Sequence, residues 1–199
     1  NAYRDVNIAF ANELSILCEE LQINVWEAIA LANRHPRVNI LNPGPGVGGH
    51  CIAVDPWFLI SPHRDKTPLM TASRLVNDGK PNIVLHAVRR QMDRFKEPVV
   101  ACLGLAYKPD IDDLRESPAV EIATHLADAN VNLLIVEPHI SELPQAIAGR
   151  PNVKLMDADT AIRDADIIVV LVGHSTFKDV PRDILLGRVV IDTVGLYQR

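Results

Sequence analysis

Apolar residues in the first half of the chain recur at three- and four-residue steps, a spacing that places them on one face of an α-helix. The opening segment has the clearest stripe, which consists of Val6, Phe10, Leu14, Leu17 and Leu21. A shorter helix is predicted around Val25–Asn33, and a longer helical stretch from about Leu69 to Phe95. The longer stretch contains Gly-Lys-Pro ending at Pro81, and we expect an interruption there because proline clashes with the preceding turn.

The pattern changes from about Pro98 onward, where short apolar runs alternate with helical segments. Four runs are continuously apolar, as expected of parallel strands that are buried on both faces; they read VVACLGL, NLLIVEP, ADIIVVLVG and RVVIDTVG. Between the first two, SPAVEIATHLADAN predicts a helix with Ser117 as its N-cap. This alternation indicates an α/β fold with a doubly wound parallel sheet. We therefore expect a helical domain over residues 1–96 and an α/β domain over residues 97–199.

Composition is that of an ordinary globular protein, with 48% hydrophobic residues and a formal net charge of −5. The negative charge argues against nonspecific nucleic-acid binding, and no apolar run is long enough to cross a membrane. Three cysteines in 199 residues do not make a disulfide framework, which favours a reducing, cytoplasmic compartment. The chain begins without methionine and already in helical rhythm, which suggests a fragment of a longer protein.

A glycine- and proline-rich segment, NPGPGVGGHCIAVDP, occupies residues 42–56. Its glycines let backbone N–H groups approach a ligand closely; they are Gly44, Gly46, Gly48 and Gly49. Cys51 follows, where CIAVDPWFLI can begin a helix, and the positive end of a helix favours the reactive thiolate. Asp55 lies one helical turn further on, where it can position a water or carry a proton. Cys51 is therefore predicted to be a nucleophile.

Other interpretations of Cys51 are weaker. A small buried hydrophobic residue is the better description of Cys18 and Cys102, which lie within apolar helix and strand patterns. A metal site from His50, Cys51 and Asp55 is disfavoured because neighbouring residues do not readily converge on one ion. The segment is not a phosphate-binding P-loop, since the lysine and serine or threonine ending is missing. A cysteine hydrolase ranks last, because His50 adjoins Cys51 and is predicted to be poorly placed to receive the thiol proton.

Four segments carry a resemblance that runs in order over essentially the whole chain. They read NAYRDVNIAFANEL, HPRVNILNPGPGVGGHCIAVDP, TASRLVND and GLAYKPDIDDLRESPA. Together they resemble the UDP-glucose/GDP-mannose dehydrogenase family, which implies a helical central and dimerisation region followed by a Rossmann-like, UDP-binding domain. GVGGHCI and VDP stand where UDP-glucose dehydrogenases carry GGxCxPKD, with Ala53 and Val54 at the usual Pro-Lys positions. The chain is therefore most similar to members that oxidise UDP-N-acetyl-D-mannosamine.

Enzymes of this family, which serve polysaccharide biosynthesis, oxidise the C6 alcohol of a sugar to a carboxylate by two hydride transfers to NAD. The resemblance implies that Cys51 attacks the intermediate aldehyde and holds a thiohemiacetal, then a thioester that water hydrolyses. It matches Asn1 to an asparagine whose amide stabilises negative charge at C6, and assigns Asp55 to the water and proton steps. Neither a strand–turn–helix unit with GxGxxG nor the lysine expected four residues before Asn1 is present. We therefore expect the NAD-binding domain to be absent and the chain alone to be inactive.

The resemblance also implies contacts with a UDP-N-acetylhexosamine and a homodimer through the helical region. The substrate-binding residues are then expected to be Arg4, His35, Arg37, Asn42, Gly44, Gly46, Gly48, Gly49, Tyr107 and Lys108. The resemblance implies that Arg37 reaches the substrate across the dimer interface, and a guanidinium suits a diphosphate because it donates paired hydrogen bonds. Arg115 matches an arginine that approaches NAD, and Val194 stands where many relatives carry an arginine for the nucleotide.

Two alternatives stay open from the sequence. The substrate could be another UDP-sugar, such as UDP-N-acetylglucosamine or UDP-glucose, because nothing in the glycine-rich segment reads the stereochemistry at C2. The chain could instead be a non-catalytic module that binds a nucleotide sugar or forms dimers, and such a module needs no reactive thiol. Fast alkylation of Cys51 that UDP-sugar slows would favour the enzyme.

Overall fold

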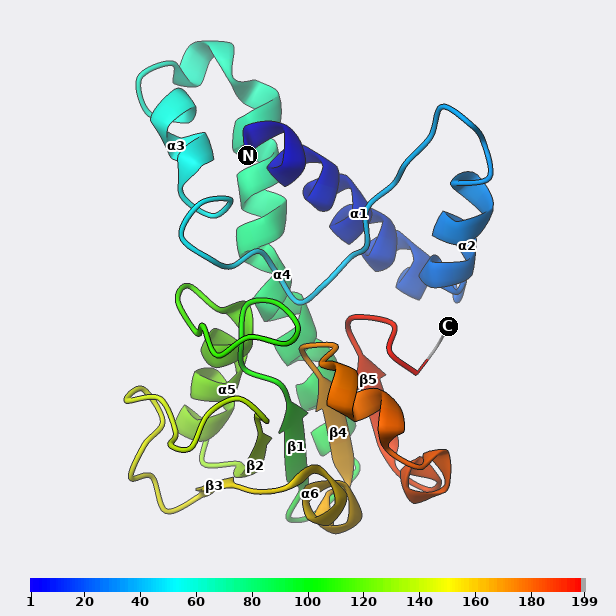
Figure 1. The fold of residues 1–199 in the computed structure, drawn as a ribbon, viewed down its shortest axis with the longest axis vertical. Coiled ribbons are helices and arrows are strands. Elements are labelled where there is room, and N and C mark those ends of the chain that lie inside the picture. Colours follow the sequence, from blue (N-terminus) through cyan, green and yellow to red (C-terminus); the bar gives the residue numbers. More distant parts are fainter. Residues whose placement is uncertain (198–199) are drawn as a thin grey trace.

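The structure is a computed structural model that describes residues 1–197, and it consists of a helical part and a parallel β-sheet (Figure 1). The helical part comprises α1 (Ala2–Glu20), α2 (Val25–Ala32), α3 (Asp55–Ile60), a 3₁₀ turn η1 (Arg64–Lys66) and α4 (Pro68–Met92). α1 packs against α4, and α4 then continues alongside the sheet (Figure 1). α1 and α2 lie where the spacing of apolar residues predicts helices.

α4 runs without interruption through Pro81, so the break predicted at this position is wrong. Proline inside a helix removes one backbone hydrogen bond and costs about 3 kcal/mol. Packing holds the helix on both sides of Pro81, because Asn77 is buried against α1 and Val88 is buried in the core against the sheet. These tertiary contacts outweigh the local preference of the sequence.

The sheet contains five parallel strands in the order β3-β2-β1-β4-β5. They are β1 (Val99–Leu103), β2 (Asn132–Val136), β3 (Val153–Leu155), β4 (Ile167–Val170) and β5 (Val189–Asp192). The predicted fold class, a helical region followed by a doubly wound α/β sheet, is confirmed. In this order the direction of winding reverses between β1 and β4, and such sheets bind ligands outside the carboxyl ends of the strands at that point.

The sheet is the middle of three layers. α4 and α5 (Pro118–Asp128) cover one face, while α6 (Ala158–Asp164), η2 (Ser175–Asp179) and η3 (Arg182–Leu185) cover the other. Successive residues of β1 serve opposite faces, as strand geometry requires: Cys102 packs with the α4 and α5 layer, and Leu103 with the α6 layer. α5 begins as predicted, with the Ser117 hydroxyl accepting a hydrogen bond from the N–H of Ala119.

The interface between α1 and α4 is polar at its centre. Arg74 donates from Nη1 to Oδ1 of Asp5 at 2.6 Å, and both side chains are almost fully buried. Asn77 donates to the same oxygen at 2.8 Å and accepts a hydrogen bond from Asn12 at 2.9 Å. Burial raises the pKa of Asp5, and the charge of Arg74 offsets this only in part. The network requires one alignment of the two helices, and it ends at Gly44, whose N–H donates to Asn12.

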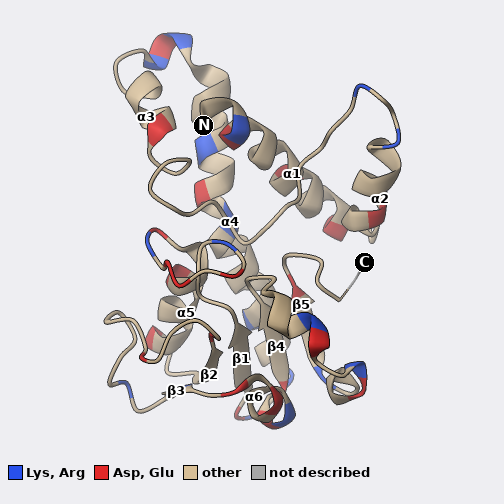
Figure 2. Ribbon diagram, in the orientation of Figure 1, with Lys and Arg blue, Asp and Glu red and all other residues tan. Residues whose placement is uncertain are grey.

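Acidic and basic residues occur in both the helical part and the sheet part (Figure 2). The loop after β1 carries both signs, with Lys108 and Arg115 close in sequence to Asp112 and Asp113. Among residues 1–197, none of the helices combines the length and the apolar character that a membrane span needs.

Candidate functional site

The glycine-rich segment passes between the helical part and the loop after β1, and its backbone bonds to both. The N–H of Gly44 donates to Oδ1 of Asn12 at 2.9 Å, and the N–H of Gly49 donates to the carbonyl of Arg115 at 3.2 Å. A β-carbon on Gly48 would lie 2.6 Å from the carbonyl oxygen of Glu116 and 2.8 Å from Cβ of Tyr107. Contacts this short are excluded, so glycine at this position lets the segment touch the loop after β1.

Cys51 lies at the end of this segment with its thiol exposed, whereas Cys18 and Cys102 are buried. α3 begins at Asp55, so the prediction that Cys51 starts the helix is wrong. Residues 51–54 form a turn in which the carbonyl of Cys51 accepts the N–H of Asp55 at 2.7 Å. The reason is the Asp-Pro pair: proline is well suited to the first turn of a helix, which therefore begins at this pair. Reactivity of the thiol must come from its neighbours rather than from a helix terminus.

His50 is the neighbour that contacts the thiol. Its Nδ1 lies 2.9 Å from Sγ of Cys51, which places the imidazole where it can take the thiol proton. The prediction that His50 is poorly placed for this was therefore wrong. Adjacent residues in a turn can direct their side chains to the same side, and the consecutive letters HC in a loop were the available signal.

Asn1 and Asp55 meet beside this pair. Nδ2 of Asn1 donates to Oδ2 of Asp55 across the starts of α1 and α3. The two residues are 54 positions apart in sequence, so only the packing of α3 near the start of α1 brings them together. An amide held by a carboxylate in this way keeps its second N–H free to point at a ligand.

Two adjoining cavities, of about 670 and 340 Å³, form a cleft between the helical part and the carboxyl edge of the sheet. Residues that line both are Arg4, Ile8, Gly46, Tyr107 and Lys108. Other predicted site residues that line one of the two are Asn1, Asn42, Gly44, Gly48, Gly49 and Cys51. The larger cavity reaches the end of β4 at Leu171 and also meets Val194. The thiol and the loop after β1 therefore face one continuous space.

Arg115 lies beside the cleft and is occupied by another residue. Its guanidinium donates from Nη2 to Asp113 at 2.6 Å and from Nε at 2.9 Å. These hydrogen bonds lower the pKa of Asp113 to about 2. The side chain of Arg115 is mostly exposed, so a ligand can compete with Asp113 for it.

His35 and Arg37 are not brought to the cleft. They lie in the exposed segment after α2, where the N–H of Arg37 donates to Nδ1 of His35 at 3.2 Å. Neither residue lines the two cavities. Any contact with substrate would have to be made to the cleft of another copy of the chain.

Among the described residues, Gly44, Gly46 and Gly49 have the GxGxxG spacing, but they do not stand between a strand and a helix, as a dinucleotide site for NAD requires. The loop that follows β1 begins Gly-Leu-Ala-Tyr-Lys and lacks the glycine pattern that cradles a pyrophosphate at a helix N-terminus. Arg115 is the residue that the resemblance assigns to NAD, and Asp113 already holds it.

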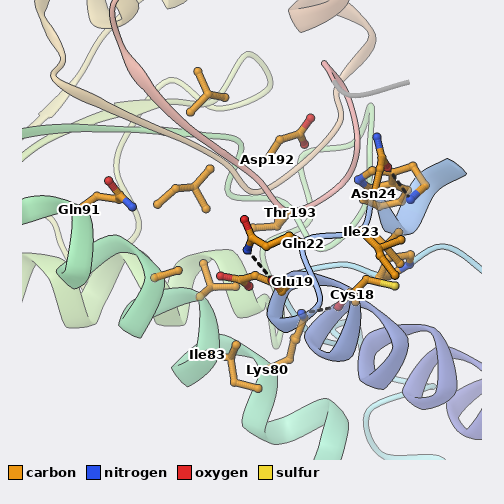
Figure 3. Close-up of a pocket in the computed structure, with 18 of the residues that line it drawn as sticks. Cys18, Glu19, Gln22, Ile23, Asn24, Lys80, Ile83, Gln91, Asp192 and Thr193 are labelled. Carbon is orange, nitrogen blue, oxygen red and sulfur yellow. Dashed lines mark hydrogen bonds between the residues drawn. The ribbon is translucent and has the colours of Figure 1, made fainter. Parts of the chain in front are cut away.

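A third cavity, of about 470 Å³, lies between α1, α2, α4 and β5, and Cys51 does not line it (Figure 3). Lys80 projects from α4 into its wall with 8% of its surface exposed, and Nζ donates to Oγ of Ser15 at 2.7 Å. Burial lowers the pKa of Lys80 from 10.5 to about 8, and the charge of Glu19 opposes this only in part.

Replacing Lys80 by methionine is expected to stabilise the chain at neutral pH. The folded-state pKa lies below the unfolded one, so burial of the ammonium group costs stability below pH 8, and this cost disappears as pH rises to 10.5. The full difference corresponds to roughly 3 kcal/mol. Urea titrations between pH 7 and pH 10 should show the stability gap between variant and wild type narrowing as pH rises. A gap that is constant with pH would contradict the buried-ammonium explanation.

Comparison with protein families gives matches to both parts of the chain. Residues 1–79 match the central domain of the UDP-glucose/GDP-mannose dehydrogenase family, and residues 101–199 match the UDP binding domain of the same family. The two matches follow one another in the order of the two structural parts.

Individual relatives agree with these matches. An NDP-N-acetyl-D-galactosaminuronic acid dehydrogenase of Ralstonia nicotianae is 56% identical over 99% of this chain and 46% of its own length. A UDP-N-acetyl-D-mannosamine dehydrogenase of Campylobacter jejuni is 54% identical over 92% of this chain and 45% of its own. The solved structure of a UDP-N-acetyl-mannosamine dehydrogenase from Staphylococcus aureus superposes with a TM-score of 0.82 at 38% identity, covering 100% of this chain and 46% of that one. The chain thus spans about half the length of these relatives.

Proposed function

Because the chain belongs to the UDP-glucose/GDP-mannose dehydrogenase family, we propose that it supplies the substrate site and the nucleophile of an NAD-dependent UDP-N-acetyl-D-mannosamine 6-dehydrogenase. The observation that carries this proposal is the cleft in which Cys51 and Lys108 face the same space. Cys51 comes from the glycine-rich segment and Lys108 from the loop after β1, so one ligand can contact both parts of the chain.

The N-acetylated sugar is proposed from the relatives and from the segment around the thiol. Names of the relatives above include UDP-N-acetyl-D-mannosamine and NDP-N-acetyl-D-galactosaminuronic acid, which share an N-acetyl group on a nucleotide-linked sugar. Ala53 and Val54 stand at the positions where UDP-glucose dehydrogenases usually carry Pro-Lys. Both features favour an N-acetylhexosamine over glucose, and the mannosamine compound is the one we propose.

The chemistry that the chain's own residues can perform starts at the thiol. His50 takes the proton from Cys51, and the thiolate adds to the C6 aldehyde, so that a C–S bond forms and the carbonyl electrons move to oxygen. The free N–H of Asn1 can donate to that oxygen and stabilise its charge, a contribution of roughly 3 kcal/mol in comparable sites. A thioester would form only if a hydride acceptor, NAD in this proposal, took the hydride from C6; Asp55 can then accept a proton from the attacking water, and the C–S bond breaks as Cys51 leaves as a thiolate.

The other end of the substrate is assigned to the carboxyl edge of the sheet. Lys108 and Arg4 both line the two cavities, and their charges suit the diphosphate of a UDP-sugar. Tyr107 lies beside Lys108, whose Nζ is 5.7 Å from the centre of the tyrosine ring. In this proposal the nucleotide lies toward β4 and the sugar toward Cys51.

A homodimer through α1 completes the proposal. Of the apolar stripe on this helix, Phe10 is 54% exposed and Leu21 is 66% exposed, so the stripe does not face the core of its own chain. A second copy covering it would explain how Arg37, remote from its own cleft, contacts substrate. Light scattering should detect a dimer that Phe10→Asp converts to a monomer; a monomeric wild type at high concentration would remove this part of the proposal.

The test of the proposed site uses Cys51 as its own reporter. We expect iodoacetamide to label Cys51 while Cys18 and Cys102, both buried, stay unmodified. Saturating UDP-N-acetyl-D-mannosamine should slow the labelling at least about tenfold, because the sugar covers the thiol. Lys108→Met should weaken this protection, whereas the exposed Lys66→Met in η1 should not.

A second measurement separates the enzyme from a non-catalytic binding module. The C6 aldehyde of the nucleotide sugar, labelled with ¹³C at C6, should form a thiohemiacetal with wild type, and NMR should show the change from aldehyde to tetrahedral carbon. Cys51→Ser should bind the same compound without this change. Protection from alkylation without an adduct would leave a binding module, and absence of both would refute the proposed site.

A further inference from the structure

The Tyr107–Lys108 turn, which lies within the loop after β1, is tied on both sides to a buried pair of side chains. The pair consists of Glu137, at the end of β2, and His174, which follows β4. Nε2 of His174 lies 3.0 Å from Oε2 of Glu137, and both residues are almost fully buried. Neither has a role in the chemistry proposed above.

Glu137 holds the beginning of the loop. Its Oε2 accepts the N–H of Leu105 at 2.6 Å and the N–H of Ala106 at 3.0 Å, immediately before Tyr107. Burial acts to raise the pKa of this carboxyl, but the hydrogen bonds from His174 and the two backbone groups together lower it. Glu137 is therefore a charged acceptor inside the protein, and such hydrogen bonds are shorter and stronger than neutral ones.

His174 holds the backbone just after the Tyr107–Lys108 turn. Its Nδ1 accepts the N–H of Asp110 at 2.9 Å, which leaves the proton on Nε2 to be donated to Glu137. Asp110 has a φ of 59°, a left-handed conformation that is costly for a residue with a side chain. The carboxylate of Asp110 also accepts hydrogen bonds from the N–H and hydroxyl of Ser175, at 2.8 and 2.9 Å. The strained end of the loop is thus held from the β4 side.

We propose that Glu137 and His174 are positioning residues that fix the Tyr107–Lys108 turn for the diphosphate of the nucleotide sugar. This rests on the proposed function. The pair connects the loop after β1 with the loop after β4, at the point where the sheet changes its direction of winding. A shift in either loop would therefore break a hydrogen bond to the other. Lys108 lies between the backbone groups that the pair holds and is placed through them.

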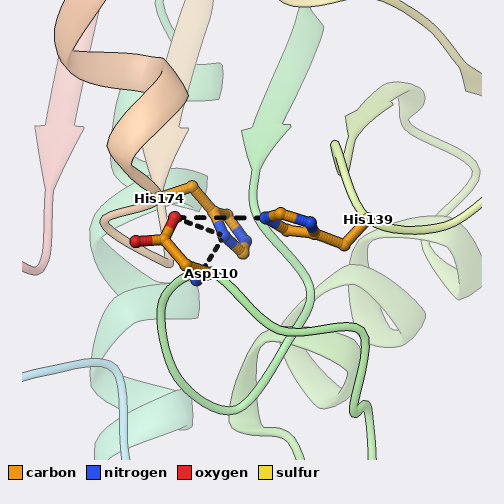
Figure 4. A group of neighbouring side chains, drawn as sticks. All are labelled: Asp110, His139 and His174. Carbon is orange, nitrogen blue, oxygen red and sulfur yellow. Dashed lines mark hydrogen bonds and ion pairs between the residues drawn. The ribbon is translucent and has the colours of Figure 1, made fainter.

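A metal site is the competing explanation of the same cluster. Ligand atoms of Asp110, His139 and His174 lie within 4.8 Å of one another (Figure 4). Both nitrogens of His174 are already engaged, however, with Glu137 and with the N–H of Asp110. The ring of His139 is tilted by 51° to that of His174, with ring centres 5.0 Å apart, and His139 is itself exposed. The hydrogen-bonded arrangement therefore explains these contacts without an ion.

The experiment measures UDP affinity by calorimetry on folded protein at low temperature, together with amide hydrogen exchange of the loop. His174→Phe removes the hydrogen bonds to Glu137 and Asp110. It should weaken UDP binding roughly tenfold, because a displacement of the turn by about an ångström moves Lys108 away from the diphosphate. His174→Asn keeps an acceptor for Asp110 and should lose less. Exchange at Leu105 and Asp110 should accelerate in His174→Phe, while the labelling rate of Cys51 without ligand should not change. The exposed His86→Phe in α4 is the matched control and should match wild type in every measurement.

The outcomes separate the two proposals. If wild type does not bind UDP, the proposed substrate site fails. If wild type binds UDP and the His174 variants bind it equally well with normal loop exchange, the positioning role fails while the site stands. Should His174→Phe not fold, Glu137→Gln provides the same measurements, since it keeps the shape of the side chain and removes its charge. Loss of UDP affinity on adding EDTA to wild type would overturn the hydrogen-bonded explanation in favour of a metal.

Discussion

Replacing Gly48 by alanine is expected to abolish the protection of Cys51 by UDP-sugar, a loss of at least about tenfold in the ratio of labelling rates. The new β-carbon would lie 2.6 Å from the carbonyl oxygen of Glu116 and 2.9 Å from Cδ of Pro118. Neither is the end of a flexible side chain, so the backbone must separate. The glycine-rich segment then moves away from Tyr107, and the two walls of the cleft no longer face one ligand; near-ångström displacements of this kind cost roughly a hundredfold in enzymes.

Gly79→Ala is the matched control for this change. Gly79 lies inside α4, and nothing is within 4 Å of the position that its β-carbon would take. Alanine is preferred to glycine in a helix interior by about 1 kcal/mol, so this variant should be slightly more stable and keep full protection. Equal protection in Gly48→Ala and Gly79→Ala would show that the close approach of the segment to Tyr107 is not needed for the site.

The role of these glycines illustrates how far the sequence reaches. Their number predicts a backbone that can approach another group closely, and Cys51 at the end of the segment predicts an exposed thiol. What the segment approaches depends on Tyr107 and Pro118, which stand far along the chain, and no local pattern contains that information. His50 was missed for a different, local reason, because its contact with Cys51 follows from the turn that precedes α3.

The fold could be predicted better than the site because buried elements appear as apolar patterns in the local sequence. β1, β2 and β4 are largely buried on both faces and appear as continuous apolar runs, β5 is partly buried, and β3 has three residues, one of them the exposed Lys154. The break predicted at Pro81 is wrong because tertiary packing leaves no local signal. A helix-breaking residue is tolerated when the neighbouring turns are well packed. No sequence pattern marks Asp5 and Arg74 as buried, because their burial follows only from the packing of α1 against α4.

Replacing Arg74 by methionine is expected to lower the free energy of unfolding by about 3–5 kcal/mol, because it leaves a buried carboxylate without its cation. Arg74 is 2% exposed and Asp5 is fully buried, so water cannot take the place of the guanidinium. Urea denaturation should show a lower midpoint with an unchanged slope. Arg90→Met is the control, since Arg90 pairs with Glu19 at 3.0 Å with both side chains exposed, and such pairs contribute about 0–1 kcal/mol.

The double variant Asp5→Leu with Arg74→Met tests the cause of this loss. Removing both charges replaces a buried ion pair by apolar side chains, a change that is often neutral or stabilising. The double variant should therefore recover much of the stability that Arg74→Met loses, and the two single changes should not add. Simple additivity would mean that Arg74 contributes through packing alone.

The series of hydrogen bonds from Asn77 through Asn12 to Gly44 also predicts a functional effect, because Arg74→Met frees Asn77 from its alignment and loosens the start of the glycine-rich segment. Cys51 protection by UDP-sugar should then fall in Arg74→Met even at temperatures where the variant is fully folded, and stay at the wild-type level in Arg90→Met.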